Sequence, residues 1–271
     1  MISIITCVYN QSKYILQTIL SVLDQTYKNF EYIILDDGSI DATTEIIKSI
    51  NDPRVKLIRN EKNLGLTKSL NIALSYATRK YIVRLDGDDI MVPNRLAVQL
   101  KFMNTNPEIA LCGSRAILIN EVGSQIRISD SVPKTDEMLK FLLWDNCLIH
   151  SSVIFRKKCI EAIGGYNENY VRTQDYNLWV DFIKKYSIAC LPYFLIGWRD
   201  HSENISTLKC QEQQDFALQI SLEFLRYTFP ELINIPDGEL IQLRKNHMQW
   251  FRSKDSPKGK EKILIEIKKR L

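Results

Sequence analysis

The first 105 residues alternate four times between short β-rich runs and segments whose apolar residues recur at helical spacing. Strands are predicted at 2–9, 30–36, 55–61 and 80–86, and a helical pattern follows each of them. Such an alternation favours a mostly parallel central sheet with helices on both faces. The sequence therefore predicts an α/β fold for this half of the chain.

The second half is less regular. A strand pair is expected at 109–120 and 125–129 around the turn "NEVG", followed by a helix over 135–146 and another from about Asp175. No linker interrupts the chain before about residue 205. We therefore expect one domain over 1–205, with halves at 1–105 and 106–205, and a helical, basic C-terminal extension over 206–271.

The positive charge of the chain is concentrated in its last 31 residues. The net charge is +4, but residues 241–271 carry +7 and the remaining 240 residues carry −3. An acidic body without a basic-aromatic stripe argues against a nucleic-acid partner. The basic amphipathic stretch at 263–270 could lie on an anionic membrane surface, or could equally be a solvated helix packed on its neighbour.

The cellular location is expected to be cytoplasmic. The chain has no run of about 20 apolar residues, which a membrane-spanning helix needs. Its N-terminus "MISIITCVYN" has no signal-peptide pattern, and its six cysteines show no CxxC spacing. The basic extension adds the possibility of a peripheral position on the inner face of the plasma membrane.

Polar residues follow all four strands of the first half, at 6–10, 36–39, 60–65 and 86–89. In open α/β sheets, ligands bind at the carboxyl ends of the strands. Because the ends of parallel strands meet at one edge of the sheet, we expect these four segments to converge. The sequence therefore predicts a binding site at this edge.

The segment "RLDGDD" places Asp86, Asp88 and Asp89 directly after the fourth strand. No GxGxxG or GxxxxGK[ST] motif is present to hold phosphates by a glycine-rich loop. A divalent cation between carboxylates would instead allow an acidic pocket to hold phosphates, and Mg²⁺ and Mn²⁺ prefer such oxygen ligands. Alternate residues of an extended segment point the same way, so Asp86 and Asp88 can face one site while Gly87 lets the backbone approach. A solvated acidic turn is the alternative.

Eight segments occur in a recognisable order: "ISIITCVYN", "LDDGSIDAT", "NEKNLGLTKSLNIAL", "YIVRLDGDDIMVPNRL", "HSSVIFRK", "IGGYNENY", "TQDYNLWVDF" and "WRDHSENIS". Over residues 1–206 this set resembles the family 2 glycosyltransferases. The resemblance implies a single Rossmann-like nucleotide-sugar-binding domain of the GT-A type. It also implies Mn²⁺- or Mg²⁺-assisted, inverting transfer of a sugar from a nucleoside-diphosphate donor to an acceptor hydroxyl.

The resemblance carries roles onto individual positions. Residues expected to bind the nucleotide-sugar are Thr6, Val8, Tyr9, Asn10, Asp37, Asn63, Lys68, Asp86, Gly87 and Arg199. Metal ligands are expected to be Asp88, Asp86 and His201. Asp175 stands where the family has its catalytic base. The structural alternatives are a helix-capping Asn63, a first-turn acid at Asp175 and a packed or surface His201.

The expected reaction is sugar transfer, with UDP-sugars as donors, in the synthesis of surface polysaccharide, lipopolysaccharide or glycolipid. The acceptor would be a saccharide or a lipid-linked saccharide. A sugar nucleotidyltransferase is the alternative enzyme class, but it needs a basic, glycine-rich loop near the N-terminus, which "TCVYNQSKY" does not supply. A nucleotide-sugar-binding relative without catalysis is the non-enzymatic alternative, against which Asp88 and Asp175 argue.

Overall fold

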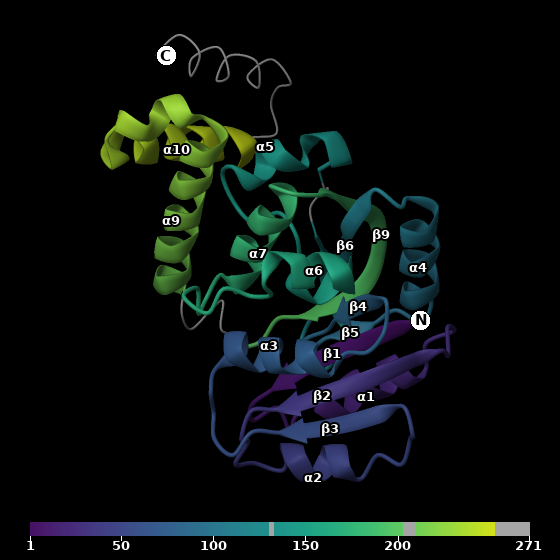
Figure 1. The fold of residues 1–271 in the computed structure, drawn as a ribbon. Helices are drawn as coiled ribbons and strands as arrows, with labels where there is room; N and C mark the ends of the chain where they lie inside the picture. Colours follow the sequence, from purple (N-terminus) through teal and green to yellow (C-terminus); the bar gives the residue numbers. More distant parts are fainter. Residues whose placement is uncertain (130–132, 203–209, 253–271) are drawn as a thin grey trace.

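The computed structural model describes residues 1–129, 133–202 and 210–252 (Figure 1). Within these residues, nine strands form one sheet in the order β3-β2-β1-β4-β8-β6-β9-β5, and β7 pairs with β6 outside this path. The first four strands are parallel, as predicted: β1 (Ile2–Val8), β2 (Phe30–Asp36), β3 (Val55–Arg59) and β4 (Tyr81–Arg84).

Helices cover both faces of this parallel part, because successive side chains of its strands point to opposite sides. On β1, Ile5 and Cys7 lie in one apolar cluster with residues of α3 (Leu66–Tyr76). Ile4 and Val8 lie in a second cluster. The helices that contribute to this second cluster are α1 (Ile15–Leu23), α2 (Thr43–Lys48) and α4 (Arg95–Thr105).

Beyond β4 the sheet becomes mixed. The short strand β8 (Ile154–Arg156) is antiparallel to both β4 and β6 (Ile109–Ile119), and thereby joins the two halves of the chain. β7 (Gln125–Ile128) forms the predicted hairpin with β6. The long strand β9 (Ser187–Arg199) runs parallel to β6 and also pairs with β5 (Ile90–Met91) just after the acidic segment.

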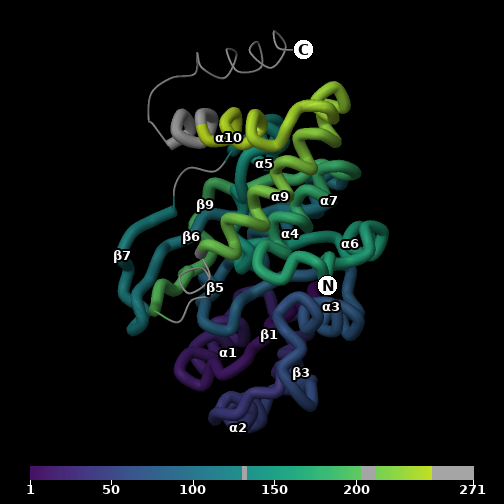
Figure 2. Tube along the Cα trace, turned by 90° about the vertical axis from the view of Figure 1, so that its left-hand side faces the viewer, coloured from purple at the N-terminus to yellow at the C-terminus, as the bar shows by residue number. Residues whose placement is uncertain are grey.

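The helices of the second half are α5 (Met138–Leu142), α6 (Lys157–Ile163), α7 (Gln174–Ile183), α9 (Cys210–Thr228) and α10 (Asp237–Arg252). Of these, α6 and α7 contact the mixed part of the sheet, α5 and α9 pack on α7, and α10 packs on α9 (Figures 1 and 2). Single 3-10 turns lie at η1 (Thr135–Glu137), η2 (His150–Ser152) and η3 (Pro230–Asn234). The predicted helices over 135–146 and from Asp175 correspond to η1 with α5 and to α7.

The C-terminal helices share the core of the sheet. α9 contacts α7, and Phe224 and Leu225 of α9 belong to the same buried cluster as Trp179 and Phe182 of α7. The expected boundary at 205/206 and the basic stretch at 263–270 both lie outside the described residues. No helix in the described part of the chain is long and apolar enough to cross a membrane.

Candidate active site

A cleft of about 1200 Å³ opens at the carboxyl ends of β1, β2 and β4. Its wall from the first half includes Tyr9, Asp37 and Asp86, and its wall from the second half includes His150 and Asp175. A pocket for one drug-sized ligand typically encloses about 300–1,000 Å³, so this cleft has room for more than one substrate. The predicted convergence of the strand ends is therefore present.

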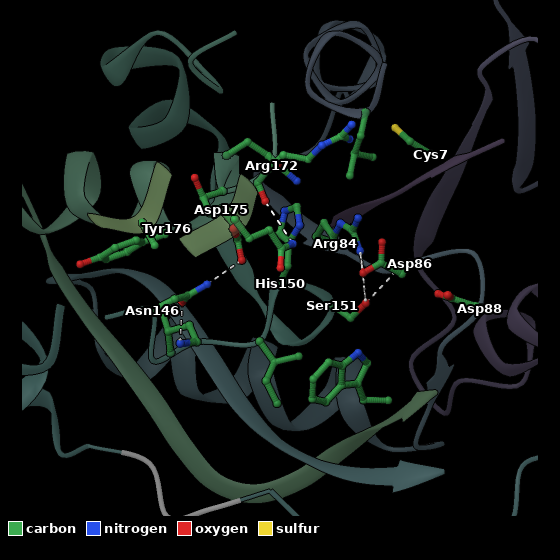
Figure 3. Close-up of a pocket in the computed structure, with 18 of the residues that line it drawn as sticks. Cys7, Arg84, Asp86, Asp88, Asn146, His150, Ser151, Arg172, Asp175 and Tyr176 are labelled. Atoms are coloured by element: carbon green, nitrogen blue, oxygen red, sulfur yellow. Dashed lines mark hydrogen bonds and ion pairs between the residues drawn. The ribbon is translucent and has the colours of Figure 1, made fainter. Parts of the chain in front are cut away.

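Asp86 forms an ion pair at the floor of the cleft. Its carboxylate contacts the guanidinium of Arg84, a fully buried side chain, and accepts a hydrogen bond of 2.8 Å from the hydroxyl of Ser151 (Figure 3). Ser151 Oγ in turn accepts the backbone N–H of Asp86 at 2.9 Å. Burial opposes ionisation of Asp86, but the adjacent Arg84 charge outweighs it and lowers the pKa of this carboxyl below its usual value.

Asp88 points to a different neighbour. Its Oδ2 lies 3.0 Å from Nε2 of His201, whose side chain is almost fully buried and lies against the ring of Tyr14 at 4.8 Å between centroids. Asp89 turns into the protein, where its Oδ1 accepts the backbone N–H of Arg199. Burial, together with the charges of Asp88 and Asp86, raises the pKa of Asp89 well above its usual value. Asp89 therefore connects the acidic loop to the backbone at the end of β9.

Arg199 differs from its expected role. Its guanidinium is fully buried and donates to the carbonyl oxygens of Asp88, Asn120 and Glu121 and to the side chain of Gln17. These bonds direct it toward the backbone and away from the cleft. Arg199 thus holds the acidic loop from behind and does not line the cleft, where a nucleotide-sugar-binding residue was expected.

Asp37 connects two strand ends. Its Oδ1 accepts hydrogen bonds from Asn60 Nδ2 (2.8 Å) and the backbone N–H of Leu64 (2.9 Å), and its Oδ2 accepts the N–H of Gly65 (2.9 Å). Asn63 accepts the same Gly65 N–H through Oδ1 and so shapes the turn before α3. The preceding carboxylate, Asp36, is fully buried and accepts bonds from Ser39 and Thr44, which is a structural role.

Asp175 lies in the first turn of α7 and faces the cleft. Nδ2 of Asn146 donates a 2.7 Å hydrogen bond to its Oδ2 (Figure 3). Burial raises the pKa of Asp175 above its usual value, and the backbone N–H of Tyr176, the Asn146 hydrogen bond and the Arg84 charge oppose this effect in part. Such a carboxylate is suited to accept a proton.

His150 lies near Asp86 at the floor of the cleft. Its Nε2 is 2.8 Å from the hydroxyl of Tyr166, and its ring packs edge-on against Trp179. Burial and the nearby Arg84 charge lower the pKa of His150 well below its usual value. The imidazole is therefore neutral and forms part of the floor of the cleft.

The structure brings most of the predicted residues to the cleft but not all of them. The predicted residues that line it are Val8, Tyr9, Asp37, Asn63, Asp86, Gly87, Asp88 and Asp175. Those outside its lining are Thr6, Asn10, Lys68, Arg199 and His201. Thr6 is buried under the sheet end and hydrogen-bonded to Tyr32, Asn10 holds the backbone N–H of Ile40, and Lys68 is exposed on α3.

Three residues of the site were not predicted as such. Arg84 had a usable signal, because an arginine in an apolar strand two residues before Asp86 must point to the same side as that aspartate. Ser151 and Asn146 had no such signal in the sequence. Ser151 is 65 residues from Asp86 along the chain, and Asn146 is 29 residues from Asp175. Such pairs depend on the fold and leave no periodic pattern in the sequence.

The residues around Asp88 fit a divalent cation only in part. In residues 1–129, 133–202 and 210–252, no group of three or more His, Cys, Asp or Glu side chains could hold a metal ion. Asp88 and His201 supply two adjacent ligand atoms, and the Asp86 carboxylate is already paired with Arg84. Mg²⁺ and Mn²⁺ commonly take one or two protein carboxylates and complete their shell with substrate phosphates and water, so a cation here would need such additional ligands beside Asp88 and His201.

Comparison with known proteins agrees with this geometry. An uncharacterised glycosyltransferase of Haemophilus influenzae is 31% identical over 238 residues, which is 84% of this chain and 74% of that protein. The structure of S. aureus TarS 1–349 in complex with UDP-GlcNAc aligns with a TM-score of 0.63 at 18% identity, over 90% of this chain and 78% of TarS.

A second solved structure shares the fold. The mannosyltransferase PcManGT from Pyrobaculum calidifontis, in complex with GDP-Man and Mn²⁺, aligns with a TM-score of 0.63 at 17% identity, over 83% of this chain and 64% of that one. Residues 3–164 match the family profile described as glycosyl transferase family 2. With a cleft at the strand ends and this match over more than half of its length, the chain belongs to glycosyl transferase family 2.

Proposed function

We propose that this protein transfers a sugar from a UDP-sugar to an acceptor hydroxyl with inversion at the anomeric carbon. The observation that carries the proposal is the joint lining of one cleft by Asp86 and Asp88 from the first half and Asp175 from the second. A single displacement needs a site for the diphosphate on one side of the sugar and a base on the other. Residues 1–105 would form the nucleotide-binding half and 106–205 the acceptor-binding half.

The nucleotide would lie between Val8, Tyr9, Asn63 and Asp37. A carboxylate offers about four lone-pair sites, and three are used in Asp37, which leaves one for a donor such as the N3–H of uracil. The structurally similar TarS binds UDP-GlcNAc, which supports a UDP-sugar, and PcManGT binds GDP-Man, which makes GDP-sugars the alternative to test.

Asp88 and His201 would hold a divalent cation, and Asp86 would face the ribose. When bound, Mn²⁺ or Mg²⁺ would neutralise the charge that develops on the leaving diphosphate. The Mn²⁺ in the PcManGT complex supports this assignment. Arg84 keeps Asp86 ionised and Ser151 fixes its orientation, so this carboxylate would be ready to accept ribose hydroxyl hydrogen bonds.

Asp175 would act as the base. As the acceptor oxygen forms its bond to the anomeric carbon, the bond from that carbon to the diphosphate oxygen breaks, and its electron pair leaves with UDP. The acceptor proton passes to Asp175 Oδ1 or Oδ2. Because the acceptor oxygen performs the displacement itself, no nucleophilic side chain of the protein is required.

A thermal-shift panel tests the donor. UDP-, GDP- and dTDP-sugars are added with and without Mn²⁺, and the preferred donor produces the largest rise in melting temperature by mass action. The absence of a shift with all of them would argue against the whole proposal. With the donor identified, Asp175→Asn is expected to abolish transfer but to keep the metal-dependent shift with UDP, and normal turnover of this variant would disprove the base assignment.

The same measurements distinguish a glycosyltransferase from the two alternative functions. A sugar nucleotidyltransferase would be stabilised by a nucleoside triphosphate and would release pyrophosphate, whereas a glycosyltransferase releases UDP. An inactive nucleotide-sugar-binding relative would show the thermal shift without turnover. The geometry favours transfer, because a binding protein has no need for the polarised carboxylate of Asp175 beside the donor site.

We further propose a saccharide or lipid-linked saccharide acceptor in surface polysaccharide, lipopolysaccharide or glycolipid synthesis. The net charge of +7 over residues 241–271 supports attachment to an anionic membrane, where such an acceptor would be found. Sedimentation with phosphatidylglycerol vesicles, but not with phosphatidylcholine vesicles, is the expected result. If equal amounts of the protein sediment with the two kinds of vesicle, the charge of the C-terminal residues does not attach it to an anionic membrane.

A further inference from the structure

The loop between α5 and η2 passes in front of the first turn of α7. Asn146 lies in this loop, and its Nδ2 donates to Asp175 Oδ2 at 2.7 Å across the cleft (Figure 3). Both residues line the cleft. Among the side chains of residues 1–129, 133–202 and 210–252, that of Asn146 donates a hydrogen bond to this carboxylate, and the backbone N–H of Tyr176 in the first turn of α7 also interacts with it.

The orientation of the Asn146 amide is determined by its own turn. Its Oδ1 accepts the backbone N–H of Leu148 at 3.1 Å, and its backbone N–H donates to Asp145 Oδ1 at 2.9 Å. Leu148 is anchored because its side chain is buried in the core. Since the oxygen of the amide is committed to Leu148, the NH₂ group must face Asp175.

We propose that Asn146 is a positioning residue, which holds the Asp175 carboxylate by one oxygen and leaves the other for the acceptor hydroxyl. The proposal rests on Asp175 being the base, as argued above. A carboxylate free to rotate about its terminal torsion would present either oxygen in many directions. With Oδ2 held by a charge-assisted hydrogen bond, the direction of Oδ1 is set before the acceptor binds.

The hydrogen bond from Asn146 also lowers the pKa of Asp175. The Asn146 N–H group stabilises the carboxylate more strongly than the protonated acid, because its bond to a charged acceptor is the stronger one. Other groups that face Asp175 are the guanidinium of Arg84 on β4, which favours its charge, and the phenol of Tyr166 in the segment after α6, which is neutral because burial raises its pKa. Loss of the Asn146 donor would therefore raise the pKa of Asp175 further.

Two substitutions separate this effect from folding. Asn146→Ala removes both the donor and the turn, whereas Asn146→Asp keeps an oxygen for the Leu148 N–H and replaces the donor by a second carboxylate. A like charge beside Asp175 raises its pKa more than simple loss of the donor. Asn167→Ala is the matched control, because Asn167 accepts the N–H of Asn169 in an equivalent turn on the surface.

The first measurement needs no substrate. Carboxyl ¹³C resonances are recorded across pH in protein labelled at aspartate, and the Asp175 signal is identified by its loss in Asp175→Asn. Its titration midpoint is expected to move to higher pH in Asn146→Ala and further in Asn146→Asp, and to stay unchanged in Asn167→Ala. An unchanged midpoint in folded Asn146→Asp would overturn the inference.

The second measurement is the pH dependence of UDP release with the donor selected by the thermal-shift panel. At pH 6 we expect a loss of about tenfold in Asn146→Ala, since a hydrogen bond to a charged group contributes that much, and recovery as the pH rises. A loss independent of pH would show a merely structural role. If the midpoint moves but Asp175→Asn still turns over, the proposed base is wrong while the hydrogen bond between the two residues stands.

Discussion

Gly87 is a residue at which the acidic loop passes close to the first strand. A Cβ atom at this position would lie 2.5 Å from Cγ1 of Val8, a stiff and buried side chain that also lines the cleft. We expect Gly87→Ala to lower the free energy of unfolding by about 1–3 kcal/mol through overpacking. It should also weaken donor binding, because Val8 or the carboxylates beside Gly87 must move.

Gly238→Ala is the control for this substitution. Gly238 is exposed in the first turn of α10, and a Cβ there would meet no atom within 4 Å. Alanine favours the helix over glycine, so this variant should be more stable by about 0.5–1 kcal/mol. Chemical denaturation measures the free energy of unfolding of both variants. A Gly87→Ala protein as stable as the parent would show that the acidic loop moves aside without loss of stability.

At the scale of single residues, the sequence was informative where a side chain belongs to a regular pattern. Asp86 and Asp88 were predicted to face one site because they alternate in an extended segment, and both line the cleft. Alternation does not predict which side chains contact each carboxylate. Arg84 contacts Asp86 from only two residues away, whereas His201 approaches Asp88 from just after β9, and this second contact arises only when the two halves of the chain fold together.

Asp37 binds the loop between β3 and α3 at one end of the sheet. Both oxygens of Asp37 bind this loop, through Asn60, Leu64 and Gly65. Asparagine offers one oxygen, and its NH₂ group would face an N–H donor. We expect Asp37→Asn to cost about 1–3 kcal/mol and to speed amide hydrogen exchange at Leu64 and Gly65.

Asp52→Asn provides the comparison for this loop. Asp52 also accepts three N–H groups, but all of them belong to Arg54 two residues away. Its substitution should leave exchange at Leu64 and Gly65 unchanged. Equal exchange in the parent and in Asp37→Asn would mean that the turn of Asn63 is sufficient to hold the loop.

Among the elements, the parallel half of the sheet was predictable and the mixed half was not. β1 to β4 each alternate with a helix, so their period and order are visible in the sequence. β5 has two residues and exists because Ile90 and Met91 pair with Gly197 and Ile196 of β9, more than 100 residues away. A strand of that length has no periodicity, and its stability comes from tertiary pairing.

For the molecule as a whole, the structure bears on whether residues 206–271 are separable. Side chains of the C-terminal helices are buried with α7 in one cluster, and include Ile220, Phe224, Leu225, Leu232 and Leu240. Each large apolar side chain contributes about 1.5–3 kcal/mol when buried, so five of them contribute about 10 kcal/mol. This is comparable to the entire stability of a typical domain, which is about 5–15 kcal/mol.

We therefore expect a protein ending at residue 205 to lack a cooperative thermal transition and to bind a hydrophobic dye such as ANS. A protein ending at residue 252 keeps every one of those five side chains and should melt cooperatively. Calorimetry and dye fluorescence distinguish the two, with the full chain as reference. Cooperative melting of the shorter protein would show that α9 and α10 form a separable unit.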